Sequence, residues 1–432
     1  ANWDEVDLFQ LKLSKDSLKY ILDKKEYNFS LKRDVIKVKG EEDIIIETKY
    51  SIHGIVKNKN GVVFAEKWHA LDFFGSSASF SAIMKSNDWD SFKNGLKKYT
   101  FPAQNFVFSD AKGNIGAISA GVLPYRFKDY RGELLDGSVS HKFTYVPFND
   151  LPQQYGNDSE FLYSANQLPA KSNYYINYSW AEQYRASRIN TVLSQKTKLN
   201  FLEMKSLQTD QVDNSFFEII KLYDSISFDN KQEKWFHELR KWDGNMNAES
   251  KVALKFHMLT LSFEHYFNEY FNGKKITRTP SMNHMINALR NESIKLNDKM
   301  VSTEKVKRSI VDYSIILYNQ YVKGDMNYGN FSPFFLNHIL GIPGLGDMVD
   351  GKGGNSNTVD VNGYSEHGAS MRTIIELSEN STHIETILAG GQSGRVNSPD
   401  YSNQTRMWKE GEYNKIDFRI NNKKKVNIRF KK

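Results

Sequence analysis

The sequence of 432 residues contains no cysteine, which excludes a disulfide framework and any chemistry that depends on a thiolate. It also contains no apolar run that approaches the roughly 18 residues that a membrane-spanning helix needs. We therefore expect a soluble protein with no membrane partner. A dense basic patch is missing as well, because the net charge of +7 is modest for this length and is spread along the chain. This distribution argues against a nucleic-acid partner.

The main concentration of positive charge is the C-terminal tail, NNKKKVNIRFKK (421–432). Basic residues alternate with apolar ones in this tail. We interpret it as an exposed edge strand whose lysines discourage pairing with other strands.

Aromatic residues are abundant: the chain has 28 Phe and 23 Tyr, and 39% of its residues are hydrophobic. Such a composition is typical of a folded globular protein and not of a disordered chain. The length allows two or three domains or one large mixed fold.

Three regions of different character follow one another along the chain. Residues 1–179 are mainly strand-like, residues 180–340 are helix-rich, and residues 341–432 return to strands after a glycine-rich stretch. We expect the late strands to rejoin the early sheet. The order of regions therefore predicts one α+β domain over residues 1–432.

Particular segments carry this interpretation. Strand-like runs occur at 48–56, 104–110, 114–122, 371–377 and 383–390, and the Lys112-Gly113 pair predicts a hairpin between the second and third of them. Helical spacing occurs at 216–226, 249–267 and 306–322. A further helix is expected at 86–99, with Ser86 as its N-cap and an apolar stripe of Trp89, Phe92 and Leu96.

The glycine-rich stretch comes close to a phosphate-binding loop without matching it. Gly346, Gly351 and Lys352 fit the G-x-x-x-x-G-K pattern, but Gly353 replaces the Ser or Thr that would hold Mg²⁺. We expect an ordinary loop, since no amphipathic helix follows to supply the anion site. The histidines form no HExxH pattern, and His53 is expected to be a hydrogen-bonded core residue.

Three carboxylates lie close together at the N-terminus: Asp4, Glu5 and Asp7. Because side chains alternate along an extended chain, Asp4 and Asp7 cannot share one strand face. A turn that directs both inward, together with the Val6 carbonyl, would suit the oxygen ligands of a calcium ion. The alternative is an acidic turn at the surface, which the residues alone slightly favour.

The stretch YSANQLPA (163–170) places two carboxamides, Asn166 and Gln167, among apolar and aromatic residues, as at a strand end near the interior. A buried carboxamide without a hydrogen bond costs roughly 1–3 kcal/mol. Asn166 can either cap a turn before Pro169 or direct its amide N–H₂ group into a cleft as a donor to an oxyanion. The residues alone leave these interpretations open. We interpret Gln167 as a turn residue.

Several stretches together resemble the penicillin acylase family of N-terminal-nucleophile (Ntn) amidohydrolases, in order and over nearly the whole chain. One of them, FVFSDAKGNIGAISAGVLPYR (106–126), resembles the family's Asp-x-x-Gly-Asn-Ile-Gly segment. The others are VDLFQLKL (6–13), SIHGIV (51–56), the stretch 163–170, WAEQYRASRI (180–189), NSNTVDV (355–361), GASMRTIIEL (368–377), GGQSGRVNSPDYSNQ (390–404) and the W-x-x-G-x-Y of Trp408 to Tyr413.

The resemblance implies an αββα sandwich of the Ntn-hydrolase type with an α-helical layer. In this family a precursor is cut into two chains, and the larger one begins with a catalytic serine. The chain begins instead with Ala1, downstream of the place of that serine. We therefore expect an incomplete fold, in which the small chain and the start of the large chain are missing partners. We expect this chain alone to be inactive.

The resemblance also implies roles for individual residues. Asn166 matches the asparagine that helps to form the oxyanion hole, and Arg188, 22 residues further on, matches an arginine that supports the active site. Gln104 matches a position that lines the acyl pocket and is apolar in the penicillin G-specific enzymes.

A metal site is implied in the same way. Asp4, Val6 through its carbonyl, and Asp7 match part of the calcium site of some family members. Asn177 falls where another ligand, an Asp, stands in those members. The resemblance thus implies a structural calcium ion and no cofactor for the chemistry itself.

The function implied by the resemblance is hydrolysis of the linear amide bond of a small N-acylated substrate through an N-terminal serine that is not present in this chain. Two alternatives remain open: a sibling acylase that acts on acyl-homoserine lactones or lipopeptides, and a noncatalytic ligand-binding or scaffold module of the same fold. The family further implies a periplasmic or extracellular bacterial protein.

Overall fold

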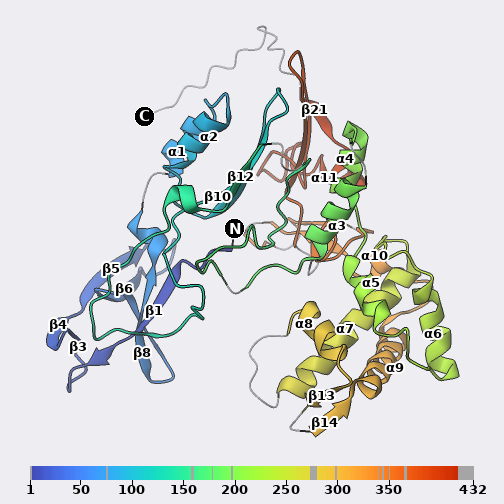
Figure 1. Cartoon of the computed structure of the whole chain (residues 1–432), viewed down its shortest axis with the longest axis horizontal. Helices are drawn as coiled ribbons and strands as arrows, with labels where there is room; N and C mark the ends of the chain where they lie inside the picture. The colour runs from blue at the N-terminus through green and yellow to red at the C-terminus, as the bar shows by residue number, and fades with distance from the viewer. Residues whose placement is uncertain are drawn as a thin grey trace. The chain divides into compact units, whose positions relative to one another are not determined.

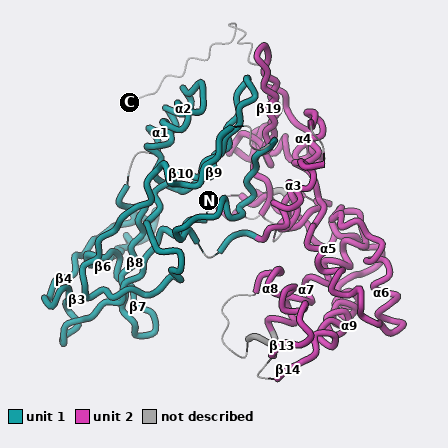
Figure 2. Tube along the Cα trace, viewed as in Figure 1, with its two compact units in different colours: residues 1–181 teal, residues 182–432 magenta. Residues whose placement is uncertain are grey.

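A computed structural model describes residues 2–73, 76–156, 160–177, 179–195, 198–272, 280–296, 299–338, 340–342, 345–349, 351–363 and 367–416. The chain divides into two compact units, Ala1–Ala181 and Glu182–Lys432, which Figure 2 shows in teal and magenta. The single domain expected from the sequence stays a prediction. The basic tail (421–432) lies outside the described residues.

The largest sheet of the first unit has the strand order β11-β1-β8-β7-β6-β5, and Figure 1 labels β1, β5, β6 and β8 of this sheet. Its strands are β1 (Val6–Gln10), β5 (Ser30–Ile36), β6 (Ile44–Ser51), β7 (Gly54–Lys59), β8 (Val62–Trp68) and β11 (Leu135–Asp136). In β1, Asp7 and Phe9 are buried and their neighbours are exposed, as the alternation of a strand requires. The carboxylate of Asp7 therefore faces the same side as the core residues Phe9 and Ala65.

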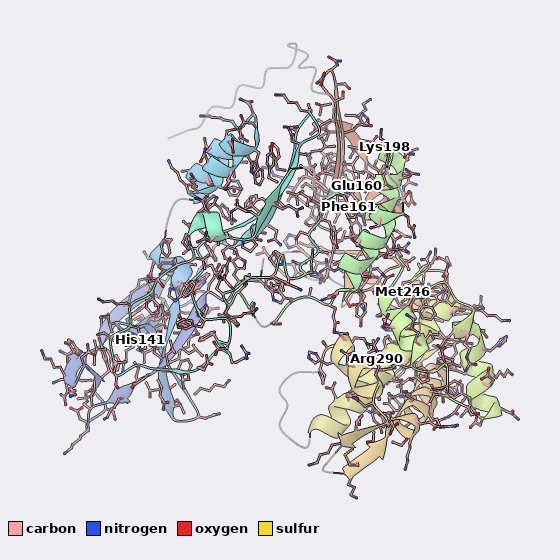
Figure 3. All side chains as sticks on the ribbon, viewed as in Figure 1. His141, Glu160, Phe161, Lys198, Met246 and Arg290 are labelled. Atoms are coloured by element: carbon pink, nitrogen blue, oxygen red, sulfur yellow. The ribbon has the colours of Figure 1, made fainter. Side chains whose placement is uncertain are left out.

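The predicted strand at 48–56 is wrong as a single element. Strand β6 ends at Ser51 and β7 begins at Gly54, so His53 lies in the turn between them. Gly54 adopts a φ of +124°, which a residue with a side chain rarely adopts. His53 is nevertheless buried and hydrogen-bonded, with Nε2 3.2 Å from the carbonyl oxygen of Gly137. Its ring stacks on Phe9 and contacts the edge of His141, which Figure 3 labels.

A second sheet of the first unit, β12-β10-β9, is covered by helices on one face. The elements are α1 (Ser76–Ile83), α2 (Trp89–Leu96), β9 (Gln104–Ser109), β10 (Ile115–Ala120) and β12 (Gln153–Tyr155), and a small sheet contains β2 (Lys12–Leu13), β3 (Lys19–Leu22) and β4 (Lys25–Asn28). The β9–β10 hairpin confirms the prediction. The apolar stripe of α2 is buried against this sheet, also as predicted.

The predicted N-cap of α2 is wrong. The carboxylate of Asp88 accepts the Ser91 N–H at 2.8 Å, and the Ser91 hydroxyl accepts the Asp88 N–H, which makes a capping box. Ser86 instead donates its hydroxyl to the carbonyl oxygen of Ile83. Aspartate at position 88 therefore starts the helix two residues later than expected.

The second unit is built on helices, most of which pack around one core, while Trp408 of α11 belongs to a separate cluster with Phe334, Val349 and Ile387. The helices are α3 (Tyr184–Ser194), α4 (Phe201–Gln208), α5 (Asn214–Lys221), α6 (Asn230–Arg240), α7 (Lys251–Asn272), α8 (Met282–Leu289), α9 (Thr303–Tyr321), α10 (Tyr328–Phe331) and α11 (Thr405–Glu410). Met246, labelled in Figure 3, is fully buried in this core. The helices expected at 249–267 and 306–322 are confirmed as α7 and α9, whereas the one expected at 216–226 ends already at Lys221.

The strands of the second unit pair among themselves. They are β13 (Ser293–Leu296), β14 (Lys299–Ser302), β15 (Phe334–Leu336), β16 (Asp347–Val349), β17 (Asn362–Gly363), β18 (His367–Gly368), β19 (Met371–Leu377), β20 (Thr382–Leu388) and β21 (Asn414–Ile416). Among the described residues, β19, β20 and β21 form a sheet of their own. The expectation that the late strands extend the early sheet by pairing with it is therefore wrong.

None of the helices among the described residues combines the length and the apolar character needed to cross a bilayer.

Candidate active site

Asn166 lies at a tight bend of the first unit and not in its interior. Its backbone has a φ of +65°, in the left-handed region that asparagine tolerates better than most residues. Ala165 beside it is buried, but Asn166 itself is exposed. Its carbonyl oxygen accepts the N–H of Ala181 at 3.2 Å, which fixes the bend. The exposed carboxamide corrects the expectation of an amide near the interior.

Gln167 stabilises the bend from within. Its Oε1 accepts the N–H of Ala165 at 2.6 Å, and its Nε2 donates to the carbonyl oxygen of Tyr163 at 3.4 Å. These bonds join residues on either side of Asn166. Gln167 is therefore the turn residue that the sequence predicted.

An open pocket adjoins this bend. Its walls include Asn105 of β9, Ser119 of β10, and Tyr163, Ser164 and Gln167 of the 163–170 stretch. Polar and apolar groups are mixed along the walls, so the pocket suits a ligand with both kinds of surface.

A chain of hydrogen bonds ties the pocket walls together. The hydroxyl of Ser119 donates to Asn105 Oδ1 at 2.6 Å, and Asn105 Nδ2 donates to Ser164 Oγ at 2.8 Å. This chain links both strands of the hairpin to the stretch that carries Asn166. Sequence reasoning missed Asn105 and Ser119; their place in strands that flank the Lys112-Gly113 turn is the signal that was available.

Gln104 precedes Asn105 on β9 and pairs with Ala120 of β10. It is exposed. Because side chains alternate, Gln104 faces the side of the sheet opposite to that of Asn105, and it is not among the residues that line the pocket described above. Its assignment to an acyl pocket stays a prediction.

Arg188 belongs to helix α3 of the second unit and is held by Asp210. Arg188 Nη2 lies 2.7 Å from Asp210 Oδ2, and Nε lies 3.0 Å from Oδ1, so the guanidinium contacts both carboxylate oxygens. This two-pronged geometry fixes the direction of the arginine as well as its position. Asp210 Oδ1 also accepts the N–H of Val212 at 3.0 Å. Asp210 was not foreseen, and no short motif joins it to Arg188.

Asn166 and Arg188 lie in different units, and each is described within its own. Their predicted roles in one active site stay predictions.

Asp7 lies at the centre of a buried polar cluster. Its Oδ2 is 2.7 Å from His69 Nε2, and its Oδ1 accepts from Arg126 Nη2 at 2.8 Å and from the hydroxyl of Tyr130 at 3.2 Å. Burial alone would raise the pKa of Asp7, but the hydrogen bond from His69 and the charge of Arg126 outweigh burial and lower it. Asp7 is therefore an ionised carboxylate with several donors.

The other oxygens expected to bind calcium also have partners. The Asp4 carboxylate accepts the hydroxyl of Tyr175 at 3.1 Å and the N–H of Val6 at 3.3 Å. Arg126 Nη2 lies 3.4 Å from the Val6 carbonyl oxygen, and Nη1 donates to the main-chain carbonyl oxygen of Asp4 at 2.6 Å. Asn177 Oδ1 accepts the N–H of Ser179, and its Nδ2 donates to the carbonyl oxygen of Asn2.

This arrangement does not fit a calcium ion. A positive guanidinium already contacts two of the expected ligands, the Val6 carbonyl and the Asp7 carboxylate, and a divalent cation beside it would meet like charge at hydrogen-bond distance. Among the described residues, no group of three or more His, Asp or Glu side chains could hold a metal ion. The structure thus brings Asp4, Val6 and Asp7 together, but around an arginine.

The lysine of the near phosphate-loop pattern is buried in the second unit. Lys352 Nζ is 3.0 Å from Asp360 Oδ1, and Arg372 Nη2 is 2.6 Å from the same oxygen. Lys352 is 2% exposed, so it is not available to a phosphate ligand. The main-chain N–H of Asp360 donates to the carbonyl oxygen of Asp210, which connects this cluster to the partner of Arg188.

Comparison with known proteins defines first the class of the fold and then the family. The solved structure of the thermostable penicillin G acylase from Alcaligenes faecalis in orthorhombic form matches with a TM-score of 0.74 at 17% sequence identity, over 99% of this chain and 86% of that chain. The fold is therefore of the Ntn-hydrolase class, with mixed helices and sheets, as the sequence predicted. The sequence profile named Penicillin amidase matches residues 1–425. The chain belongs to the penicillin amidase family of amidohydrolases. Among curated proteins no match was found.

Proposed function

We propose that this chain supplies the oxyanion-stabilising part of an amidohydrolase that cleaves the linear amide bond of a small N-acylated substrate. The observation that carries the proposal is the setting of Asn166 in a member of this family. The residue is exposed at a left-handed bend, and residues on both sides of it, Ser164 and Gln167, line an open pocket. Asn166 itself is not among the residues that line this pocket; in this proposal its carboxamide reaches the substrate from the adjoining bend.

The nucleophile in this proposal is an N-terminal serine outside the 432 residues. Its own α-amino group would accept the hydroxyl proton, a task suited to a group whose pKa lies at roughly 7.7–8.0. A serine inside the chain cannot act in this way because its nitrogen is part of a peptide bond. We propose accordingly that the 432 residues alone are inactive, and that the partners are the small chain and the first segment of the large chain.

The reaction would proceed by acyl transfer to the serine. The serine oxygen attacks the amide carbonyl, and the carbonyl oxygen becomes an oxyanion that accepts a hydrogen bond from Asn166 Nδ2. The amine leaves with a proton, and water then attacks the acyl-serine and releases the carboxylic acid. This sequence needs no cofactor. The donor matters most in the transition state, where the negative charge on oxygen develops.

Arg188 would support this site as a positioning residue. Asp210 holds its guanidinium by two oxygens, and the Asp360 cluster contacts Asp210 through the main chain. A side chain fixed in this way keeps a constant direction during turnover.

The proposal commits to no particular acyl group, because Gln104 is polar and exposed and does not favour a phenylacetyl group. By family, we place the protein in the periplasm or outside a bacterial cell.

The decisive experiment replaces Asn166 by glycine in the processed product of the full open reading frame. Glycine adopts a φ of +65° without strain, so Asn166→Gly removes the carboxamide and keeps the bend. We expect kcat to fall roughly 100- to 1000-fold on a chromogenic acyl-amide, with little change in KM. The matched control is Asn60→Gly, which removes another asparagine with a φ of +53° from the β7–β8 turn.

The outcomes separate the proposal from its rivals. A loss of kcat in Asn166→Gly and none in Asn60→Gly supports the oxyanion role. Hydrolysis of acyl-homoserine lactones or lipopeptides with the same dependence on Asn166 would change the substrate class and keep the mechanism. An Asn166→Gly enzyme that retains full kcat, or a processed product that hydrolyses none of these substrates, contradicts the proposal.

A further inference from the structure

One buried arginine joins the N-terminal segment to the rest of the first unit. Arg126 is 8% exposed, and its guanidinium reaches the Asp4 carbonyl, the Val6 carbonyl and the Asp7 carboxylate. Both terminal nitrogens and Nε are used, since Nε lies 3.2 Å from Asp7 Oδ1. The five N–H donors of a guanidinium form a rigid fork, so contacts of this kind specify one geometry.

The oxygens around Arg126 are those that a hard cation would bind. Two main-chain carbonyls and one carboxylate within four consecutive residues converge on one point, and this is a common pattern of calcium ligands. The guanidinium carries a permanent positive charge and is more weakly hydrated than an ammonium group, so it can be buried among these oxygens. The remaining acceptor of Asp7, Oδ2, is taken by His69 Nε2.

Residues around Arg126 add further contacts between the N-terminal segment and the rest of the first unit, and we call this region (Asp4 to Asp7 with Arg126, His69 and Tyr175) the junction. The Arg126 carbonyl accepts the N–H of Tyr175 at 3.1 Å, and the Tyr175 hydroxyl donates to Asp4 Oδ2 at 3.1 Å. His69, which is fully buried, also contacts the hydroxyl of Tyr145 through Nδ1 at 3.1 Å. Segments that are far apart in the sequence therefore meet around Asp4 to Asp7.

We infer that the Arg126 guanidinium is the built-in cation of this junction and takes the place of a calcium ion. The N-terminal segment is then held by a covalently attached charge, and the first unit keeps its fold without any divalent metal. This inference concerns the fold of the chain and is independent of the proposed hydrolase activity.

The first test measures the thermal unfolding midpoint of the whole chain in excess EDTA and in millimolar CaCl₂. We expect the same midpoint in both solutions. A midpoint that falls in EDTA and is restored by calcium overturns the inference, and this measurement needs no variant.

The second test replaces Arg126 by glutamine, with Arg131→Gln as the matched control. Arg131 is exposed and donates to the main-chain carbonyls of Lys128 and Tyr130, and within the part of the chain that the structure describes its side chain shows no contact with a buried carboxylate. We expect Arg126→Gln to lower the midpoint by on the order of 10 °C, because it leaves Asp7 as a buried charge without its cation. Arg131→Gln should change it by less than about 2 °C. Equal effects of the two variants overturn the inference.

A third test covers the case in which Arg126→Gln does not fold. Arg126→Lys keeps the charge and loses the fork, so it should fold with an intermediate midpoint. Arg126→Gln introduced into an Asp7→Asn chain should lower the midpoint much less than in the original chain, because the buried carboxylate that needs the cation is then absent. If the changes in midpoint caused by the two substitutions simply add, Arg126 does not stabilise the Asp7 carboxylate, and the inference is refuted.

Discussion

Replacing Asp360 by asparagine would leave two buried cations without the carboxylate that they share. Lys352 and Arg372 both contact Asp360 Oδ1, and Gln211 Nε2 donates to Oδ2 at 3.2 Å. The side chains of the two cations and of Asp360 are 2–3% exposed. Both positive charges also lie over the ring of Trp408, with Lys352 Nζ 5.2 Å and the Arg372 guanidinium 5.1 Å from its centre.

The size of the effect follows from the burial of all three groups. Removing one partner from a buried ion pair costs about 3–5 kcal/mol, because the remaining charge is left without compensation. The amide oxygen of an asparagine can still accept one hydrogen bond, so we expect Asp360→Asn to lower the free energy of unfolding by about 3 kcal/mol. An exposed ion pair provides the control: Glu410→Gln, which breaks the contact with Arg406, should cost less than about 0.5 kcal/mol.

The pH dependence of the Asp360 variant has a definite sign. Burial lowers the pKa of Lys352, and Asp360 opposes this effect. Without Asp360 the folded-state pKa of Lys352 falls further, so between that pKa and the usual lysine value the unfolded chain binds more protons than the folded one. The free energy of unfolding of the variant then rises with pH. We expect the difference in free energy of unfolding between the variant and the original chain to become smaller as the pH approaches the usual lysine pKa of about 10.4.

The assay is urea unfolding followed by circular dichroism, together with hydrogen exchange of peptides from β19 and β20, which adjoin the cluster. We expect faster exchange in these peptides for Asp360→Asn and unchanged exchange for Glu410→Gln. If Asp360→Asn lowers the free energy of unfolding by less than about 1 kcal/mol, which is the range of an ordinary hydrogen bond, the argument from buried charge is refuted.

Two further predictions concern one residue in each unit. Burial in α7 lowers the pKa of His257 from 6.5 to about 4, so the folded state resists protonation; we expect the free energy of unfolding to fall by up to about 3 kcal/mol as the pH drops from 6.5 to 4. The check is to measure the free energy of unfolding of His257→Phe over the same pH range. A dependence on pH as steep as that of the original chain would contradict the prediction. A Cβ atom at Gly54 would lie 2.2 Å from the Glu66 carbonyl oxygen at a φ of +124°, so Gly54→Ala should cost about 3 kcal/mol or more. Gly61→Ala, where φ is +82° and the space is open, should cost only about 1 kcal/mol in the same unfolding assay.

Local patterns in the sequence predict local structure well in this chain. The stripe of Trp89, Phe92 and Leu96 identifies the buried face of α2 because helical spacing alone brings these residues to one side. The hairpin at Lys112-Gly113 follows from the turn residues and the flanking β-branched runs. The run at 48–56 failed because its residues suit a strand on either side of His53, and only Gly54 marked the reversal.

Contacts between distant residues explain what the sequence did not reveal. Asp7 was identified as a chemically important residue, but its partners His69 and Arg126 lie 62 and 119 residues away. A cluster of acidic residues predicts that a cation is needed and does not say which one. The same holds for Arg188, whose partner Asp210 belongs to the loop after α4. The exposed bend of Asn166 depends on Ala181 and Gln167, and its left-handed backbone has no sequence pattern of its own.

The measurement that tests the central proposal most directly compares two preparations on one panel of acyl-amide substrates. One is the processed product of the full open reading frame, and the other is the chain of 432 residues alone. We predict that the processed product releases the carboxylic acid and the amine in equal amounts and that the chain alone releases neither. Hydrolysis by the chain alone at a comparable rate would contradict the account, because the nucleophile would then lie within these residues.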